Sequence, residues 1–202
     1  MNTQAFITAL EKNLYKVSHF ATAEEAADYL DKSLDGREIG LACSATMSEM
    51  GLADRLAVHN TVYDPAEGNS EEDFLTLSKQ CLTAEIYMVS VNAAAETGEF
   101  VNLDATGNRL AGSLFGHRKV YFIVTANKVE PTLEKAIRRA RNVAGPEDAK
   151  RMGLTTPCAA KGDKCYNCSA PDRICNGMAV YLRKMEGVEE AEVILIDEAM
   201  GF

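Results

Sequence analysis

The sequence has no excess of basic residues and no long apolar run, and these two absences exclude classes of partner. Its 202 residues include 21 Lys plus Arg against 30 Asp plus Glu, which gives a net charge of -9. Broad nucleic-acid and anionic-membrane surfaces need a basic excess, so we expect neither partner. The longest apolar runs, such as residues 121–124, are far too short to span a bilayer.

The first 16 residues lack the basic start, the long apolar centre and the cleavage site that mark a signal peptide. We therefore expect a cytoplasmic protein. In such a reducing compartment, six cysteines are more often thiols or metal ligands than disulfides. The length and the absence of internal repeats or a long linker predict a single domain over residues 1–202.

Common catalytic and nucleotide-binding motifs are also missing. There is no P-loop lysine motif and no complete GxGxxG fingerprint to support nucleotide binding. The three histidines, His19, His59 and His117, occur in unrelated contexts, and none stands beside a nucleophile as its base. Any functional assignment must therefore come from other patterns.

Apolar stripes at helical spacing alternate along the chain with short apolar runs typical of strands. This alternation predicts an α/β fold with a mainly parallel sheet flanked by helices. We expect one helix over residues 2–16 and another from Thr22, where Glu25 completes a capping box. The clearest predicted strands are residues 38–43, 85–91, 100–104, 119–125 and 192–197.

A further helix is predicted to start at Pro131 and Thr132, since proline is tolerated in a first turn. The charge run of Arg138, Arg139 and Arg141 is interpreted as the solvated face of that helix. From residue 145 to residue 177 the pattern becomes proline-punctuated, which predicts a loop-rich module within the domain.

Polar residues follow three of the predicted strands within residues 92–128. Ligands of open α/β sheets bind beyond the carboxyl ends of the strands, so these residues predict one pocket. The three groups are Glu96, Thr97 and Gly98, then Gly107, Asn108 and Arg109, and finally Asn127 and Lys128.

The residue types in this predicted pocket suit a small anion. Arg109 and Lys128 would neutralise it, Arg109 through a planar fork of donors. Glu96, next to a strand end, is the candidate acid–base catalyst. The alternatives are a structural pair between Arg109 and Asp104, and ordinary loop polarity for Asn127 and Lys128. The residues expected to orient the ligand are Thr97, Gly98, Asn108 and Asn127.

An earlier strand, residues 38–43, runs into a turn of small polar residues that contains Ser44 and Thr46. Such a turn can present hydroxyls and backbone N–H groups to an anion. The alternative role for Ser44 or Thr46 is simple helix capping. Cys43 and Cys81 are interpreted as small core residues.

Cys158, Cys165, Cys168 and Cys175 are separated by six, two and six residues. Four thiolates suit a tetrahedral zinc site or an iron–sulfur cluster, and the two-residue spacing of the middle pair is common in such sites. A metal would also hold together a segment that has little apolar content. The alternatives are a redox-active dithiol at the middle pair and four inert thiols.

Several motifs resemble the LUD, or lactate-utilisation, domain family. They are AETG at residues 95–98, GNRLAG at residues 107–112, Asn127 with Lys128, and the four-cysteine segment, which is similar to that of small stand-alone members. The resemblance implies a fold like the NagB/RpiA/CoA-transferase group. It also implies an association with the oxidation of L-lactate to pyruvate, beside iron–sulfur subunits, without assigning a catalytic step to this domain.

Three functional hypotheses follow. The first is a protein of 2-hydroxy acid utilisation that binds a small anionic metabolite or cofactor at the strand ends. The second is a non-catalytic accessory subunit of an oxidoreductase, carrying iron–sulfur or zinc at the four cysteines. The third, a transferase or ligase acting on CoA or folate, depends on fold analogy alone.

Overall fold

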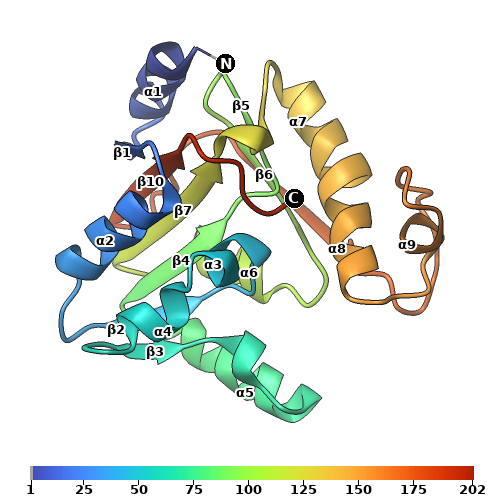
Figure 1. Cartoon of the computed structure of the whole chain (residues 1–202), viewed down its shortest axis with the longest axis horizontal. Coiled ribbons are helices and arrows are strands. Elements are labelled where there is room, and N and C mark those ends of the chain that lie inside the picture. The colour runs from blue at the N-terminus through green and yellow to red at the C-terminus, as the bar shows by residue number, and fades with distance from the viewer. Residues whose placement is uncertain (1) are drawn as a thin grey trace.

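The computed structural model describes residues 2–202, and its main element is a six-stranded sheet (Figure 1). Every neighbouring pair of strands in it is parallel, so all the carboxyl ends lie at one edge. The strands, in spatial order, are β1 (Lys16–Phe20), β10 (Glu190–Ile196), β7 (Lys119–Thr125), β4 (Ile86–Ser90), β2 (Glu38–Leu41) and β3 (Thr61–Tyr63).

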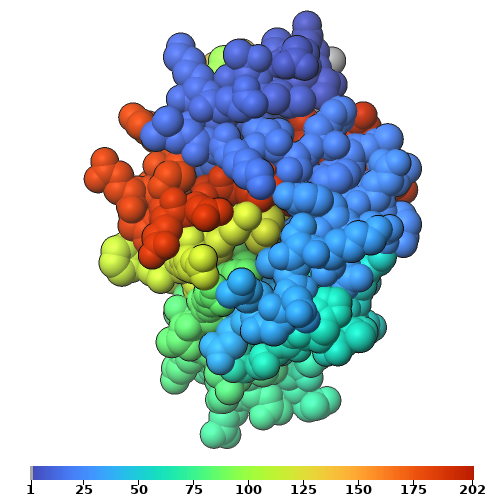
Figure 2. All heavy atoms as spheres, turned by 90° about the vertical axis from the view of Figure 1, so that its left-hand side faces the viewer, coloured from blue at the N-terminus to red at the C-terminus, as the bar shows by residue number. Residues whose placement is uncertain are grey.

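Helices flank this sheet, which confirms the predicted fold class. Among them, α2 packs against β1 and β10, α5 against β2 and β3, and α6 against β4. Figure 2 shows α1 and α2, in blue, covering much of one side of the molecule. None of the helices in residues 2–202 is long and apolar enough to cross a bilayer. The helices are α1 (Thr3–Lys12), α2 (Ala23–Ser33), α3 (Ala45–Glu49), α4 (Leu52–Leu56), α5 (Glu71–Cys81) and α6 (Asn108–Leu114), with 3₁₀ turns η1 (Pro65–Glu67) and η2 (Ala126–Lys128).

A second, smaller sheet was not expected from the sequence. In it β5 pairs antiparallel with β6 and parallel with β8, and β6 pairs antiparallel with β9. Helix α7 (Leu133–Arg139) packs over β5 and β6, around a small separate core that includes Val101 and Ala136. The strands are β8 (Val129–Glu130), β5 (Ala93–Ala95), β6 (Phe100–Asp104) and β9 (Gly177–Tyr181).

The predicted first helix is too long, because it ends at Lys12 and not at residue 16. Leu14 adopts a left-handed backbone with φ 68°, which stops the helix. The alternating residues that follow form β1, the edge strand beside β10. The capping box of Thr22 and Glu25 is confirmed at the start of α2.

The prediction of loop from residue 145 is wrong at its beginning. Helix α7 (Leu133–Arg139) continues through a π turn, η3 (Ala140–Ala144), into α8 (Gly145–Arg151). Pro146 lies in the first turn of α8, where the changed hydrogen-bond register of the π turn accommodates its missing N–H. A short helix, α9 (Pro157–Lys161), follows before the chain becomes irregular (Figure 1).

Candidate functional site

A small polar cavity of about 30 Å³ lies at the edge where β2, β4 and β7 end. It shares Cys43, Asn92 and Arg109 with a larger cleft of about 390 Å³, so the cavity forms an inner recess of that cleft. The position beyond the carboxyl ends of parallel strands is the one expected for a ligand site. The residues of the recess that matter below are Ser44, Thr46, Ser90, Asn92, Arg109 and Lys128.

Lys128 follows β7 in the turn η2, and its side chain is only 2% exposed. Its Nζ donates a hydrogen bond to Thr46 Oγ1 at 2.6 Å. Burial lowers the pKa of Lys128 to about 7, helped by the nearby Arg139 and Arg109 and opposed by Glu49. Much of this buried side chain is therefore a neutral amine near neutral pH.

Arg109 reaches the recess from the first turn of α6, which Gly107 begins with a left-handed backbone at φ 98°. Its guanidinium donates to the carbonyl oxygens of Cys43 and Leu103. The alternative pairing with Asp104 is wrong, because Asp104 Oδ2 accepts instead from the N–H of Leu110 at 3.1 Å. Arg109 is thus held by neutral acceptors.

The interpretation of Arg138, Arg139 and Arg141 as a solvated face is wrong for Arg139. Its side chain is buried, whereas Arg138 and Arg141 are exposed. It donates to the carbonyl oxygens of Asn127 at 3.1 Å and Asn92 at 2.7 Å. The arginine therefore joins the ends of β4 and β7 behind the recess, a role that helical spacing alone did not indicate.

Three basic side chains thus converge here without an Asp or Glu partner in the described residues. Within residues 2–202, neither Arg109, Lys128 nor Arg139 forms an ion pair with an Asp or Glu side chain within 4.0 Å. Arg139 also donates to the main-chain oxygen of Phe202, the last residue of the sequence, at 3.2 Å. Arg151, which also lines the recess, is paired with Asp148 at 2.8 Å. Arg109 in particular therefore keeps a positive charge that no Asp or Glu side chain of residues 2–202 neutralises, and a small anion can complement it.

Ser44 caps α3 and also lines the recess, while anion binding by its hydroxyl stays a prediction. Its Oγ accepts from the Met47 N–H at 3.3 Å and lies 2.6 Å from Ser90 Oγ. Thr46 is almost fully buried beside Lys128. Ser90 was not predicted, although its position at the end of a buried apolar strand was a usable signal.

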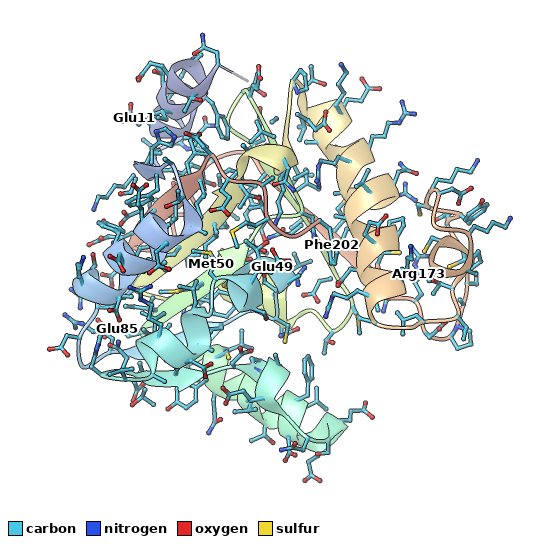
Figure 3. The ribbon with its side chains drawn as sticks, viewed as in Figure 1. Glu11, Glu49, Met50, Glu85, Arg173 and Phe202 are labelled. Atoms are coloured by element: carbon cyan, nitrogen blue, oxygen red, sulfur yellow. The ribbon has the colours of Figure 1, made fainter. Side chains whose placement is uncertain are left out.

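Asn127 does not line the recess but positions the last residues of the chain. Its side-chain amide donates to the Met200 carbonyl at 3.3 Å, as the Thr125 hydroxyl does at 3.1 Å. Glu49 accepts from the N–H of Gly201 at 3.0 Å. Figure 3 shows Glu49 and Phe202 near the centre of the molecule, where this segment, residues 197–202, crosses the ends of the strands.

The predicted group of Glu96, Thr97 and Gly98 lies elsewhere. These residues form the turn between β5 and β6, and none of them lines the recess or the cleft. Gly98 packs against α1, where Asn13 donates to its carbonyl oxygen at 3.1 Å. The grouping fails because β5 leaves the main sheet and joins the second one, so its end points away from the other strand ends. Asn108, in contrast, lines the cleft beside Arg109.

A family model for the LUD domain matches residues 3–196. This chain belongs to the LUD domain family. Membership supports, in general terms, a protein of the lactate-utilisation type. A crystal structure of a DUF162 family protein from Deinococcus radiodurans has the same overall fold, with a TM-score of 0.52 and 12% identity over 96% of this chain and 95% of that one. No curated protein matches the sequence.

Cys43 of this LUD domain is more than a core residue, because it is half-buried and lines both the recess and the cleft. Burial raises the pKa of its thiol to about 11, so it is protonated at neutral pH. Cys81 matches the predicted role of a small buried core residue. Neither thiol has the low pKa of a nucleophilic cysteine.

The four C-terminal cysteines of the LUD domain all line one cavity of about 260 Å³ beside α8. Donors face their sulfurs: Arg173 Nε lies 3.2 Å from Cys175 Sγ, and the Asn167 N–H lies 3.3 Å from Cys165 Sγ. Such donors suit thiolates, so the residue types fit a metal or a cluster. Across residues 2–202, however, no three Cys, His, Asp or Glu side chains are gathered closely enough to hold one ion.

The cysteine cavity and the cleft are neighbours. Ile174 and Cys175 line both, and so do Leu103 and Gly145. Figure 3 places Arg173 beside α8, on the side of the molecule away from α1 and α2. A conformational change in the four-cysteine segment would therefore move residues 174 and 175, which form part of the wall of the cleft.

Proposed function

We propose that this LUD domain binds a small carboxylate of the 2-hydroxy acid class, such as lactate, in the recess at the strand ends. The observation that carries the proposal is the meeting of Arg109 and Lys128 in a polar recess, with Arg139 behind them and no Asp or Glu partner for any of the three in the described chain. A ligand carboxylate would supply the missing negative charge.

The surrounding groups define how such an acid would be held. Arg109 presents the planar donors that match a carboxylate. The hydroxyls of Ser44 and Ser90, 2.6 Å apart, would bind the 2-hydroxyl group. The adjoining cleft of about 390 Å³ falls at the lower end of the range for ligand pockets, which favours a small metabolite or part of a cofactor.

The test is replacement of Arg109 by Ala. We expect L-lactate or pyruvate to raise the melting temperature of the wild-type protein, and this shift to disappear in the variant. A charge-assisted hydrogen bond contributes about 1.5–3 kcal/mol, so affinity should fall roughly 10- to 100-fold. Arg138→Ala is the matched control, because Arg138 is exposed on α7 and should leave the shift unchanged. Equal shifts in wild type and Arg109→Ala would remove Arg109 from the site.

A second candidate function is that of a metal-bearing accessory subunit of an oxidoreductase, partnered by iron–sulfur subunits. It is favoured by the four cysteines that line one cavity and by the N–H groups directed at their sulfurs. Cys158, Cys165, Cys168 and Cys175 would be the ligands, and a modest closure of the loop around the cavity would be needed to gather them.

Replacement of Cys165 by Ser tests this second function. In protein purified without oxygen, we expect the wild type to contain zinc, or iron with sulfide and a visible absorption band, and the variant to lose it. Cys81→Ala is the control. Cys81 is buried, it contacts the Leu41 carbonyl of β2, and it lies outside the four-cysteine segment. Full retention of metal in Cys165→Ser would contradict four-thiolate ligation, and metal-free wild type would leave redox thiols as the account of the cysteines.

A further inference from the structure

The amine of Lys128 is buried in surroundings that favour its neutral, nucleophilic form. Its neighbours from every packed element are mostly cationic or neutral: Arg109 from α6, Arg139 from α7 and Thr46 from α3. Glu49, also on α3, is the carboxylate that opposes this lowering of the pKa, and it accepts from the N–H of Gly201. Asp148, which lines the same recess, is paired with Arg151. Near pH 7 the amine therefore has a free lone pair much more often than an exposed lysine does.

We infer that Lys128 forms an imine with the ketone carbon of a small 2-oxo acid, the oxidised counterpart of a 2-hydroxy acid. This inference rests on the proposed function, because Arg109 would hold the carboxylate of the same ligand. Arg109 and Lys128 line one recess of about 30 Å³. A 2-oxo acid carries its carboxylate and its carbonyl on adjacent carbons, which matches a guanidinium and an amine placed so closely.

The reaction needs no oxidant or further reactant. The Nζ lone pair attacks the ketone carbon, the C–N bond forms, and the carbonyl π electrons move to oxygen. A proton passes from nitrogen to that oxygen, which gives a carbinolamine. The C–O bond then breaks as the nitrogen lone pair forms the C=N bond, the hydroxyl takes up a proton and leaves as water, and loss of the last N–H proton gives the neutral imine.

Groups able to move these protons surround Nζ. The Thr46 hydroxyl lies 2.6 Å from it, and the paired hydroxyls of Ser44 and Ser90 line the same recess. The adjoining cleft of about 390 Å³ shares Cys43, Asn92 and Arg109 with the recess, so the released water can leave through it. The recess thus offers proton donors and proton acceptors, and the cleft offers space for the leaving group.

Residues 197–202 cover the amine and restrict its access to bulk water. Gly201 has a left-handed backbone at φ 59°, and a Cβ at this position would overlap Thr46 Oγ1 and come within 3.2 Å of Lys128 Nζ. Thr125 and Asn127 hold the preceding carbonyl in place. This cover would protect an imine from hydrolysis, and it requires glycine at residue 201.

The alternative is a purely structural role for Lys128, in which its hydrogen bond to Thr46 holds α3 against the end of β7. The two roles are separated by reductive trapping of the full chain with pyruvate and cyanoborohydride at neutral pH, followed by intact-mass and peptide analysis. We expect one adduct per chain, located on Lys128, because exposed lysines with a pKa of about 10.4 stay protonated there. No adduct, or adducts spread over exposed lysines, would overturn the inference.

Matched controls make the result specific. Lys128→Met should abolish the adduct, while Lys135→Met, at an exposed position on α7, should keep it. L-Lactate has no carbonyl and should give no adduct. A melting-temperature shift with pyruvate but no adduct would overturn the imine and leave the proposed function standing, whereas no shift with either acid would overturn both. If Lys128→Met fails to fold, the location of the adduct in the wild-type peptides decides alone.

Discussion

Replacement of Glu192 by Gln is expected to lower the free energy of unfolding by about 3–5 kcal/mol at neutral pH, as for a buried ion pair that loses one partner. Glu192 lies in β10 with 0% exposure. Its carboxylate accepts from Lys119 at 2.7 Å, Ser18 at 2.6 Å and Tyr29 at 2.8 Å. Gln keeps the size of the side chain but removes the charge that Lys119 faces, and it introduces a donor amide.

The effect of this substitution should depend on pH. Burial alone would raise the pKa of Glu192, but the hydrogen bonds from Lys119, Ser18 and Tyr29 outweigh it and hold the pKa below its usual range. A depressed carboxyl pKa stabilises the fold fully above the ordinary pKa of about 4.3, and this stabilisation is lost as pH falls through the folded-state value. Denaturant unfolding of wild type and variant should therefore converge in acid.

The control for Glu192 is Glu190→Gln, two residues earlier in the same strand. Glu190 lies 3.6 Å from the same Lys119, but its side chain is 63% exposed. Its removal should change stability by no more than an exposed pair does, about 0–1 kcal/mol. If both variants lost the same free energy of unfolding, burial would not explain the contribution of Glu192 to stability.

Replacement of Lys128 by Met is expected to raise the free energy of unfolding at neutral pH, by about 0.5–2 kcal/mol. The unfolded chain carries a protonated lysine with a pKa near 10.4, whereas the folded chain holds this group at a pKa of about 7. Folding must therefore remove the proton or bury the charge, and Met avoids this cost. The gain in stability would be accompanied by loss of ligand binding, since the recess loses its amine.

The sign of the pH dependence distinguishes this account from simple packing. Between about pH 7 and pH 10 the unfolded state binds more protons at Lys128 than the folded state, so this group makes wild-type stability rise with pH. The penalty is complete below the folded pKa and absent above the unfolded one. Difference curves of unfolding free energy against pH should show the advantage of Lys128→Met shrinking across this window. An advantage that stays constant would contradict a depressed pKa.

The sequence predicted the part of the site that follows strands of the main sheet. Ser44 and Lys128 were found because each comes soon after an apolar run, and parallel strands bring their carboxyl ends together. Arg109 was predicted by the same signal, but the strand before it, β6, belongs to the second sheet, and Arg109 reaches the recess from α6, which packs against β4. The turn at Glu96 gave the same local signal but failed. Residues 93–95 form a separate strand of the second sheet, and no local pattern shows which sheet a strand joins.

Other members of the site depend on tertiary structure that sequence patterns do not specify. Arg139 lies in a run of arginines, and only the packing of α7 over the second sheet turns it inward while Arg138 stays exposed. The cover by Gly201 arises because β10 ends at the same edge as β7. The four cysteines line one cavity, but the metal that their spacing predicts stays a prediction.

The most direct measurement is a crystal structure of the wild-type protein with oxamate, an unreactive analogue of pyruvate and lactate. We expect the carboxylate of oxamate within hydrogen-bond distance of the Arg109 guanidinium, with its carbonyl directed toward Lys128 Nζ. Binding at the turn of Glu96 and Thr97, or a recess that stays without oxamate at saturating concentration, would contradict the proposed site.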